Sequence, residues 1–518
     1  MVKVNAKIIC YFLFFSSFFL AAAPLDNIPT NSWIYDAIDY LKTVGYITSI
    51  PASSKPWTRQ EIISLLKEAN ISKSYNNNQA GFYINRLLSE FADELMLDLK
   101  TTKRTPMLKI DYGYGNIFFN LYGQIFHSKF PNYWYYWLTP YGDNIFPNNQ
   151  TLTSGFLINL DNNSKFSLFH RSELTFYNKK IYDTTDAGFF HISGLRVMES
   201  SNILTYDIKE AYLSLPIYFL TLEFGRDYLY FGPAYRSSVI LSDIAPSFDQ
   251  IQLRVSSNNY KAFWFVSALS PWNYYHRFLS GQRFEVNLGK HLRFGGTMLV
   301  VYSFDSLQTK GFWGYLNPLL PIYEEVANTG HDDNFLIGFD LVAYLKQLKM
   351  YGLLMLDNYE FNQRPERPPN CYGLTIGVYL PIKQFAIRSE YSKITRYTYY
   401  HRIYHIAYTN YSVPLGHSLG PDADEFFIRF EYYPIEKLQV NLVGCWQRRG
   451  DGNRGDLANK TWEQNDMRPG RFPSGIVEKI RFIGPEFHFY PRFDIQFSAG
   501  LYFNNNEIDN FIKIAYRI

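Results

Sequence analysis

The chain has 518 residues, a formal net charge of +3 and a mean hydropathy of −0.21. The small net charge gives no reason to expect a nucleic-acid partner, and the mean hydropathy excludes a protein made of many membrane-spanning helices. Aromatic residues make up 19% of the chain, with 44 tyrosines and 44 phenylalanines, and an excess of this size needs a structural explanation.

The first 23 residues have the pattern of a secretory signal peptide. Lys3 and Lys7 precede an apolar run, residues 8–20, that ends in three alanines. This run is shorter than the roughly 20 residues of a membrane-spanning helix, and Cys10 lies inside the run rather than after the small residues. We therefore expect cleavage near Ala23 and export of the mature chain.

Residues 24–103 are expected to form a small periplasmic bundle of helices. Apolar residues recur at helical spacing over residues 33–41. Thr58 and Glu61 have the spacing of a capping box, which predicts the start of a second helix. A third helix is predicted over residues 79–99 from the same apolar periodicity.

Residues 104–518 alternate apolar and polar residues in one segment after another. In the last hairpin, Phe497 and Leu501 fall on one face of the predicted strand, whereas Gln496 and Ser498 fall on the other. Successive side chains of a strand point to opposite faces, so each such strand has an apolar face and a polar face. A soluble sandwich shows the same alternation, so the pattern alone does not select a membrane protein.

The lengths of the connections separate these two folds. Seven connections are short: Leu215–Tyr218, Ser256–Asn259, Gly289–His291, Leu345–Leu348, Leu380–Lys383, Tyr433–Glu436 and Tyr490–Arg492. Between them lie four long connections: Asp227–Ser247, Ser303–Asn334, Thr395–Ala423 and Gln447–Glu478. Short turns at one rim and long loops at the other are typical of a transmembrane β-barrel. Such a barrel also uses aromatic residues in girdles at both membrane interfaces.

Counting back from Ile518 predicts a large antiparallel barrel of about 18 strands, with 16 to 20 possible. The count includes a first strand within Met107–His127, a strand over Lys165–Tyr177 and a strand over Phe189–Met198. The N-terminal third is the uncertain part, because Phe156–Leu160 also has the composition of a strand. An even number of strands places both termini in the periplasm.

Two cysteines follow the signal peptide, Cys371 and Cys445. Both fall near the long-loop ends of their predicted strands, which are separated by three strand spacings of about 4.8 Å each. A disulfide needs a Cβ separation of about 4 Å. The geometry therefore favours two free thiols.

Three stretches, Leu222–Leu253, Asp332–Leu341 and Pro414–Pro434, together resemble the Wzi family of capsule assembly proteins of the outer membrane. The most specific part of the resemblance is a GRxxxxxGP pattern formed by Gly225, Arg226, Gly232 and Pro233. The resemblance implies an 18-stranded barrel, a periplasmic helical bundle and a lectin-like role in holding capsular or extracellular polysaccharide. It transfers no glycan-binding residue to this chain, because the family's glycan contacts lie in variable outer loops.

The segment that contains this motif has two interpretations. The glycines and Pro233 allow a sharp bend after a strand, and the mostly small or apolar segment that follows could enter the lumen as a plug. Arg226 or Arg236 would then pair with an inward carboxylate such as Glu210 or Glu223. Alternatively, the motif is a structural corner that contacts no ligand.

Several aromatic and basic residues of the predicted outer loops are candidates for glycan binding. A tyrosine ring suits a sugar, because both combine an apolar face with hydroxyl groups. The candidates are Trp134, Tyr135, Trp137, Trp272, Tyr397, Tyr399, Tyr400, Arg402, Tyr404 and Arg448. The tyrosines near position 400 could equally continue a strand above the membrane and form part of its aromatic girdle.

No catalytic signature is present: the chain has no GxSxG elbow, no HExxH and no phosphate-binding glycine loop. We therefore expect neither enzymatic activity nor a cofactor or metal. The expected partners are surface polysaccharide and outer-membrane lipids. The helical start is also similar to surface-layer homology modules, which implies a cell-wall polymer as a further partner. The alternative function is a porin or sugar channel that these helices anchor to the cell wall.

Overall fold

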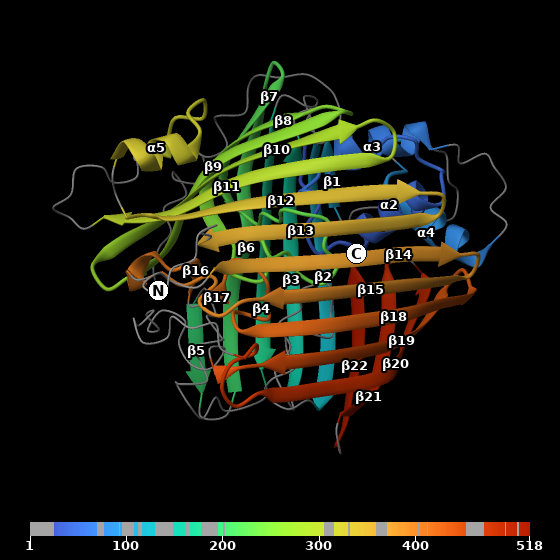
Figure 1. Cartoon of the computed structure of the whole chain (residues 1–518). Coiled ribbons are helices and arrows are strands. Elements are labelled where there is room, and N and C mark those ends of the chain that lie inside the picture. The colour runs from blue at the N-terminus through green and yellow to red at the C-terminus, as the bar shows by residue number, and fades with distance from the viewer. Residues whose placement is uncertain are drawn as a thin grey trace.

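The computed structural model describes residues 25–69, 77–92, 94–95, 108–111, 116–129, 149–161, 166–177, 195–199, 202–304, 315–329, 332–358, 370–401, 403–411, 413–451, 471–492, 494–504 and 507–517. Most of these residues belong to one antiparallel sheet (Figure 1). The proposed signal peptide lies outside the described residues. Among the described helices, none combines the length and the apolar character that crossing a membrane requires.

The strands, in chain order, are β1 (Leu108–Asp111), β2 (Asn116–Lys129), β3 (Asn149–Asp161), β4 (Ser167–Tyr177), β5 (Leu195–Glu199), β6 (Asn202–Ile217), β7 (Leu220–Asp227), β8 (Phe248–Ser256), β9 (Tyr260–Trp272), β10 (Tyr275–Leu288), β11 (Leu292–Phe304), β12 (Asn334–Leu345), β13 (Leu348–Asn358), β14 (Cys371–Ile382), β15 (Phe385–Ile394), β16 (Thr409–Asn410), β17 (Val413–Pro414), β18 (Ala423–Ile435), β19 (Leu438–Arg449), β20 (Glu478–Arg492), β21 (Ile495–Asn504) and β22 (Glu507–Arg517). The helices are α2 (Trp33–Thr43), α3 (Arg59–Glu68), α4 (Asn78–Glu90) and α5 (Ile322–Thr329), and η3 (Tyr404–Ile406) is a single 3₁₀ turn.

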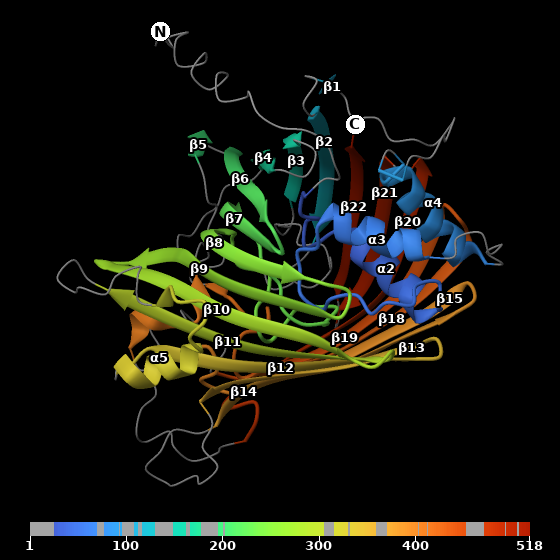
Figure 2. The ribbon, with the colours of Figure 1, turned by 90° about the horizontal axis from the view of Figure 1, so that it is seen from above.

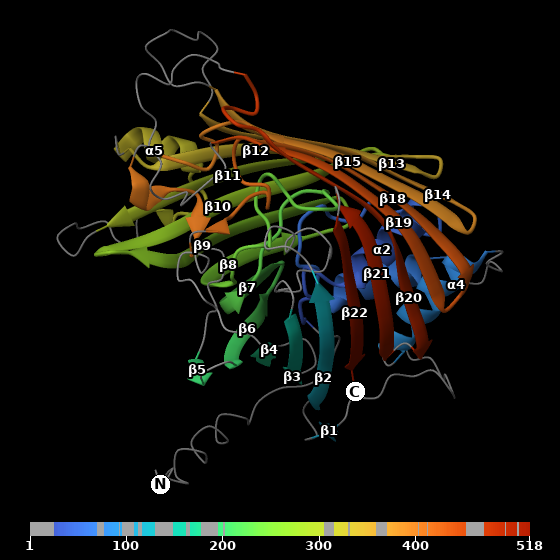
Figure 3. The same ribbon diagram turned by 90° about the horizontal axis from the view of Figure 1, so that it is seen from below.

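Eighteen of these strands form a closed ring. The ring closes where the last strand, β22, pairs with β2, and Figure 3 shows these two strands side by side. The predicted number of strands is therefore confirmed. One member was assigned wrongly: β3 belongs to the ring, pairing with β2 and β4. The segment predicted over Phe189–Met198 is described only from Leu195, where the short strand β5 pairs with β6 alone.

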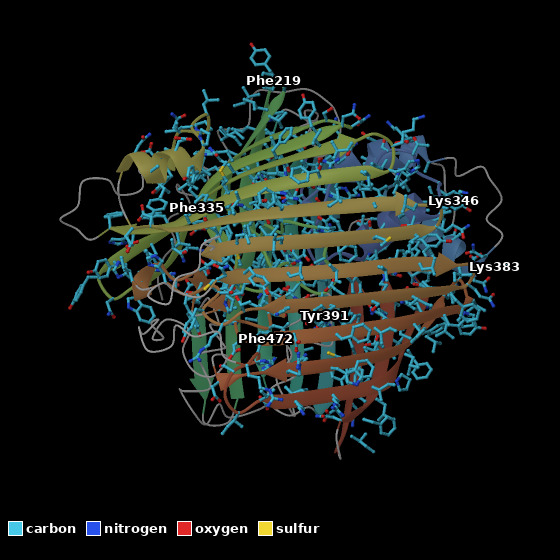
Figure 4. The ribbon with its side chains drawn as sticks, in the orientation of Figure 1. Phe219, Phe335, Lys346, Lys383, Tyr391 and Phe472 are labelled. Carbon is cyan, nitrogen blue, oxygen red and sulfur yellow. The ribbon has the colours of Figure 1, made fainter. Side chains whose placement is uncertain are left out.

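The two ends of the ring differ as the connection lengths predict. Two-residue turns join β6 to β7, β12 to β13, β14 to β15 and β18 to β19 at one end, which we call the short-turn end. Lys346 and Lys383 lie in two of these turns, along one edge of the view in Figure 4. The four predicted long connections all start and finish at the opposite end, which we call the long-loop end.

The outer wall of the barrel carries a band of apolar residues. On β18, Phe426 and Phe430 are exposed, whereas the alternate residues Phe427 and Arg429 are buried. The last strand follows the same rule, since Ile512 and Ile514 point outward. A continuous outward-facing apolar band on a closed barrel is the surface that a lipid bilayer covers.

The N-terminal helices begin and pack largely as the sequence predicts. Ser32 caps α2, and Thr58 and Glu61 form the complete capping box of α3. The third helix, α4, ends at Glu90, about two turns earlier than predicted. Figure 2 shows the three helices inside the ring of strands at its short-turn end.

Candidate functional site: the closed lumen and the outer rim

A plug, residues 228–247, fills the middle of the barrel. It connects β7 to β8, and Phe231, Val239, Ile240 and Leu241 on it are completely buried. These side chains pack against inward-facing residues of the wall such as Phe265, Leu299, Leu336 and Met355. Of the two interpretations of the GRxxxxxGP motif, the structure therefore matches the plug.

The two glycines of the motif are required by close packing and by backbone conformation. Gly232 has φ +112°, and a Cβ atom there would lie 2.4 Å from Leu353 Cδ2. Gly225 lies in β7 with φ +134°, and its Cβ would lie 2.3 Å from the backbone oxygen of Ala211. Any larger residue would be strained at either position. Pro233 follows directly and lines a small cavity at the base of the plug.

Polar contacts fix the plug to one side of the wall. The buried carboxylate of Glu390 on β15 accepts hydrogen bonds from the backbone N–H groups of Tyr235 at 2.7 Å and Arg236 at 3.1 Å. Arg236 also pairs with the buried Glu425 of β18 at 3.3 Å. The carboxylates of Glu390 and Glu425 thus both have partners on the plug, which burial of a charge requires.

The predicted partners of the motif arginines were wrong. Arg236 pairs with Glu425 rather than with Glu210 or Glu223. Arg226 faces outward on β7 and pairs with Asp249 on β8 at 2.9 Å, because residues 223 and 226 are an odd number of positions apart and so face opposite sides of the strand. Glu210 pairs instead with Arg171 at 2.7 Å, and Glu223 with Arg254 at 3.8 Å.

The N-terminal segment meets the plug from the other side. Lys55 and Tyr230 exchange two backbone hydrogen bonds, of 2.7 and 3.1 Å. The Lys55 ammonium lies between the rings of Tyr35 and Tyr230, 4.3 and 4.7 Å from their centroids. Burial lowers the pKa of Lys55, and the two aromatic faces and the Thr30 carbonyl at 3.0 Å stabilise its charge.

The helices are attached to the short-turn half of the wall by ion pairs. Asp39 of α2 pairs with Lys349 of β13 at 2.5 Å, and Glu61 of α3 pairs with Lys261 of β9 at 2.9 Å. In α4, Asn78 donates hydrogen bonds to the backbone oxygens of residues 433 and 434. A cavity of about 70 Å³ remains between plug and helices, which has room for a few water molecules only. The described residues therefore close the lumen in two layers.

The tyrosines near position 400 lie over the plug. The hydroxyl of Tyr399 donates to the Val239 carbonyl at 3.0 Å, and that of Tyr408 donates to the Ile240 carbonyl at 2.7 Å. Tyr397, Tyr399 and Tyr400 are all buried. In this arrangement the ring of Tyr399 has no surface for a glycan and supports the plug. Tyr397 and Tyr400 are buried in a separate cluster with Cys371.

An exposed aromatic group lies at the long-loop end of β9 and β10. Trp272 does not lie in a long loop, contrary to the expectation from the sequence: β9 extends to Trp272, and a two-residue turn leads into β10 at Tyr275. Tyr274 in this turn is 90% exposed. The ring of Tyr275 stacks on His405 with centroids 3.8 Å apart and planes at 4°. We call Trp272, Tyr274, Tyr275 and His405 the rim aromatics.

The remaining candidates are distributed as follows. Trp134, Tyr135, Trp137 and Arg402 lie outside the described residues, as does the side chain of Tyr404. Arg448 faces outward on β19 and forms two hydrogen bonds to the carboxylate of Asp424 on β18, at 2.9 and 2.5 Å. It therefore lies on the outer wall of the barrel, apart from the rim aromatics.

The sequence does not predict the stack of His405 on Tyr275, nor the contact of the Pro51–Trp57 segment with the plug. Neither has a local signal, because each acquires its role from residues far away in the chain. Cys371 and Cys445 are both buried free thiols, as the strand spacing predicts. No group of three potential metal ligands occurs among the described residues.

Comparisons with known proteins agree with this fold. Wzi from Escherichia coli, described as an outer-membrane protein involved in group 1 capsule assembly and a carbohydrate-binding β-barrel, is 15% identical, with a TM-score of 0.64 over 95% of this chain and 99% of that chain. OprD from Pseudomonas aeruginosa is 9% identical, with a TM-score of 0.43 over 78% of this chain and 95% of that chain. A sequence comparison with curated proteins gave no match. The sequence model of the capsule assembly protein Wzi matches residues 141–510, most of the chain, so this outer-membrane β-barrel belongs to the Wzi family of capsule assembly proteins.

Proposed function

We propose that the protein binds capsular or extracellular polysaccharide at its outer surface, where it helps to attach or assemble the capsule without catalysing a reaction. The single observation that carries the proposal is the closed lumen, because a large polymer then meets the protein only from outside. Membership of the capsule assembly family supports it, as does the carbohydrate binding attributed to the structural neighbour from Escherichia coli.

In this proposal the long-loop end faces the outside of the cell. Transmembrane barrels of bacteria have short periplasmic turns and longer extracellular loops. Residues 24–103 would then lie on the periplasmic side, and the outward apolar band would contact outer-membrane lipids. The rim aromatics would face the surroundings of the cell, where polysaccharide is available.

The rim aromatics are suited to sugar rings. Trp272 and Tyr275 are held by strands, and the stack of Tyr275 on His405 fixes one ring plane. A rigid aromatic surface loses little conformational entropy when a ligand binds, and tyrosine combines an apolar face with a hydroxyl group. This surface is the best-placed glycan contact within the described part of the long-loop end.

The alternative function, a porin or sugar channel anchored to the cell wall by the helices, is less well supported. A channel needs a continuous aqueous path, whereas among the described residues the plug and the helices occupy the lumen and the cavity between them measures about 70 Å³. The apolar faces of the three helices are also occupied, because they pack on each other and on Tyr379 and Tyr433 of the wall.

A deletion in the native host tests the capsule role. We expect loss of surface-attached capsule and release of polysaccharide into the medium, measured by capsule staining and by assay of the supernatant. Re-expression of the wild-type chain must restore the capsule. Wild-type capsule levels in the deletion strain would contradict the proposal.

A binding measurement tests the rim aromatics. Polysaccharide purified from the native host is titrated into the detergent-solubilised protein, and the double variant Trp272→Ala/Tyr274→Ala is expected to bind about tenfold or more weakly, since buried aromatic contacts dominate such surfaces. Tyr218→Ala is the matched control, because Tyr218 is fully exposed at the short-turn end. Equal weakening in both variants would show that the rim aromatics are not the site.

A further inference from the structure

A group of basic residues lies on the outer wall near the long-loop end, where β15, β18, β19 and β20 run side by side. In the strand register, Arg448 is opposite Asp424 on one neighbour and Lys479 on the other. In the next row toward the short-turn end, Trp446 is opposite Phe426 and Arg481. Neighbouring strands lie about 4.8 Å apart, so these side chains form one continuous surface.

The surface is hollowed. A cavity of about 410 Å³ opens on it, and the connection that precedes β20 supplies another wall through Arg471 and Phe472. Figure 4 labels Tyr391 of β15 and Phe472, which both line this hollow. The Lys393 ammonium of β15 lies 4.4 Å from the centre of the Phe472 ring and so fixes this side of it. We call this hollow the outer-wall pocket.

The outer-wall pocket has an excess of positive charge. Its lining includes the cations Arg448, Arg471, Lys479 and Arg481, and one carboxylate, that of Asp424. Asp424 is already paired, since it accepts both hydrogen bonds of the Arg448 guanidinium. Among the described residues, Lys479 and Arg481 have no ion-pair partner, and both are exposed.

The charges lie directly above the apolar band. The row below Trp446 and Arg481 contains Ile428 and Ile483, and the row below that contains Phe430 and Leu442. Aromatic residues such as Trp446 and Phe426 mark the level of the membrane interface. Lys479 and Arg481 therefore lie at the height of lipid headgroups. The outward-facing residues of the two rows below them contact the acyl chains.

We propose that the outer-wall pocket binds the phosphate of a phosphorylated glycolipid in the outer leaflet, with Arg481, Lys479 and Arg448 at the phosphate and the apolar rows below against the acyl chains. Guanidinium and ammonium groups form charge-assisted hydrogen bonds to phosphate oxygens. The position of the pocket favours a lipid over an acidic polysaccharide, because it opens sideways at the membrane level and continues into the apolar band. The proposal is independent of the polysaccharide role.

The test uses the full-length protein in detergent, titrated with diphosphoryl lipid A and followed by native mass spectrometry. The double variant Lys479→Gln/Arg481→Gln is expected to bind this lipid at least about tenfold more weakly than the wild type, because two of the charge-assisted contacts are lost. Lys383→Gln/Arg492→Gln is the matched control: it removes two cations from the short-turn end and should bind as the wild type does.

Two further arms decide between ligands. Inorganic phosphate at equal concentration should not displace the lipid, and full displacement would show a site for free phosphate. Alginate, an acidic polysaccharide, should bind equally to the wild type and to the double variant. A selective loss of alginate binding in that variant, with lipid binding unchanged, would overturn the proposal in favour of an acidic polymer.

A charge-preserving variant keeps the test valid if the glutamine variant does not fold. Lys479→Arg/Arg481→Lys should bind the lipid within about threefold of the wild type, since phosphate recognition here depends mainly on charge. Lipid binding by the wild type should also weaken as salt rises from 0.05 to 0.5 M, because the distance over which exposed charges act falls from about 14 Å to about 4 Å. Salt-independent binding would contradict a phosphate contact.

Discussion

The two halves of the lumen are closed by different means. At the short-turn end, folded helices are attached by ion pairs such as Lys349 with Asp39. Toward the long-loop end, a plug without regular secondary structure is held mainly by apolar packing. One strand shows why both closures are possible: along β11, the inward residues are Arg293 and Thr297 near the short turn, then Leu299 and Val301. The wall itself changes from polar to apolar, and each closure matches the half that it fills.

Removing first the plug and then the N-terminal helices as well should have the largest effect of these tests, measured as sugar uptake into proteoliposomes. Replacing residues 233–245 by a short glycine-serine linker should leave the helices in place and allow little sugar uptake. Deleting residues 25–95 as well should open the lumen and give rapid swelling of proteoliposomes in a sugar solution. Rapid swelling after removal of the helices alone would show that the plug is not a closure.

Arg283 is expected to contribute most to stability among single residues of the polar half. Its guanidinium is completely buried and pairs with Glu285 at 2.9 Å and Asp340 at 2.7 Å, and it donates to the Ser53 hydroxyl at 2.9 Å. Arg283→Met leaves two buried carboxylates without this partner and should lower the free energy of unfolding by about 3–5 kcal/mol. Denaturant unfolding measures this effect, and Arg492→Met, at an exposed ion pair, should change little. Equal effects of the two variants would contradict the account.

The buried His417, which lies next to the plug, should make the free energy of unfolding depend on pH. Burial lowers its pKa to about 4, an effect that Arg236 reinforces and the nearby Glu425 opposes. The ordinary histidine pKa is about 6.5, so the unfolded chain binds a proton more readily between pH 6.5 and 4, and stability falls as the pH is lowered through this range by up to about 3 kcal/mol. The protection of residues 413–422 against hydrogen exchange, taken as the ratio of the intrinsic to the observed exchange rate at each pH, should therefore be lower at pH 5 than at pH 7.

The control for this pH effect is His417→Asn, whose side-chain oxygen can replace the ring nitrogen that accepts the Leu419 N–H. This variant should lose most of the difference in protection between the two pH values. The same pH dependence in the variant would assign the effect to carboxylates elsewhere.

Tyr399→Phe is expected to have the smallest effect. The change removes one hydrogen bond to the Val239 carbonyl and one from the His417 N–H at 2.9 Å. Two buried backbone groups lose their partner, which should cost about 1–3 kcal/mol. Faster hydrogen exchange should be confined to the plug and to the segment near position 417, and exchange faster throughout α2 would contradict the separation of the two closures.

The ring of strands was predictable because its signals are local. The alternation of apolar and polar residues and the short turns recur along the chain. An error in assigning one strand therefore leaves the assignment of the other strands unchanged. The error fell on β3, whose sequence around Thr153 and Asn159 contains many small and polar residues and alternates weakly. The Phe189–Met198 segment alternates better but contributes only the short β5.

The candidate site was less predictable because irregular segments have no periodicity. Nothing in the sequence distinguishes the buried ring of Tyr399 from the exposed ring of Tyr274. Within a regular strand, by contrast, the sequence does predict which way a side chain points. Counting alternate faces along β7 places Arg226 outside and Glu223 inside. The same count along β19 and β20 places Arg448, Lys479 and Arg481 on the outer wall.

The central claim is that this protein acts at its outer surface and not through its lumen. Planar-bilayer recording of the purified full-length protein tests this most directly, with the double deletion of plug and helices as the conducting reference. The account predicts no steady conductance for the wild-type chain and open-channel steps for the reference. Steady open-channel conductance of the wild type would contradict it.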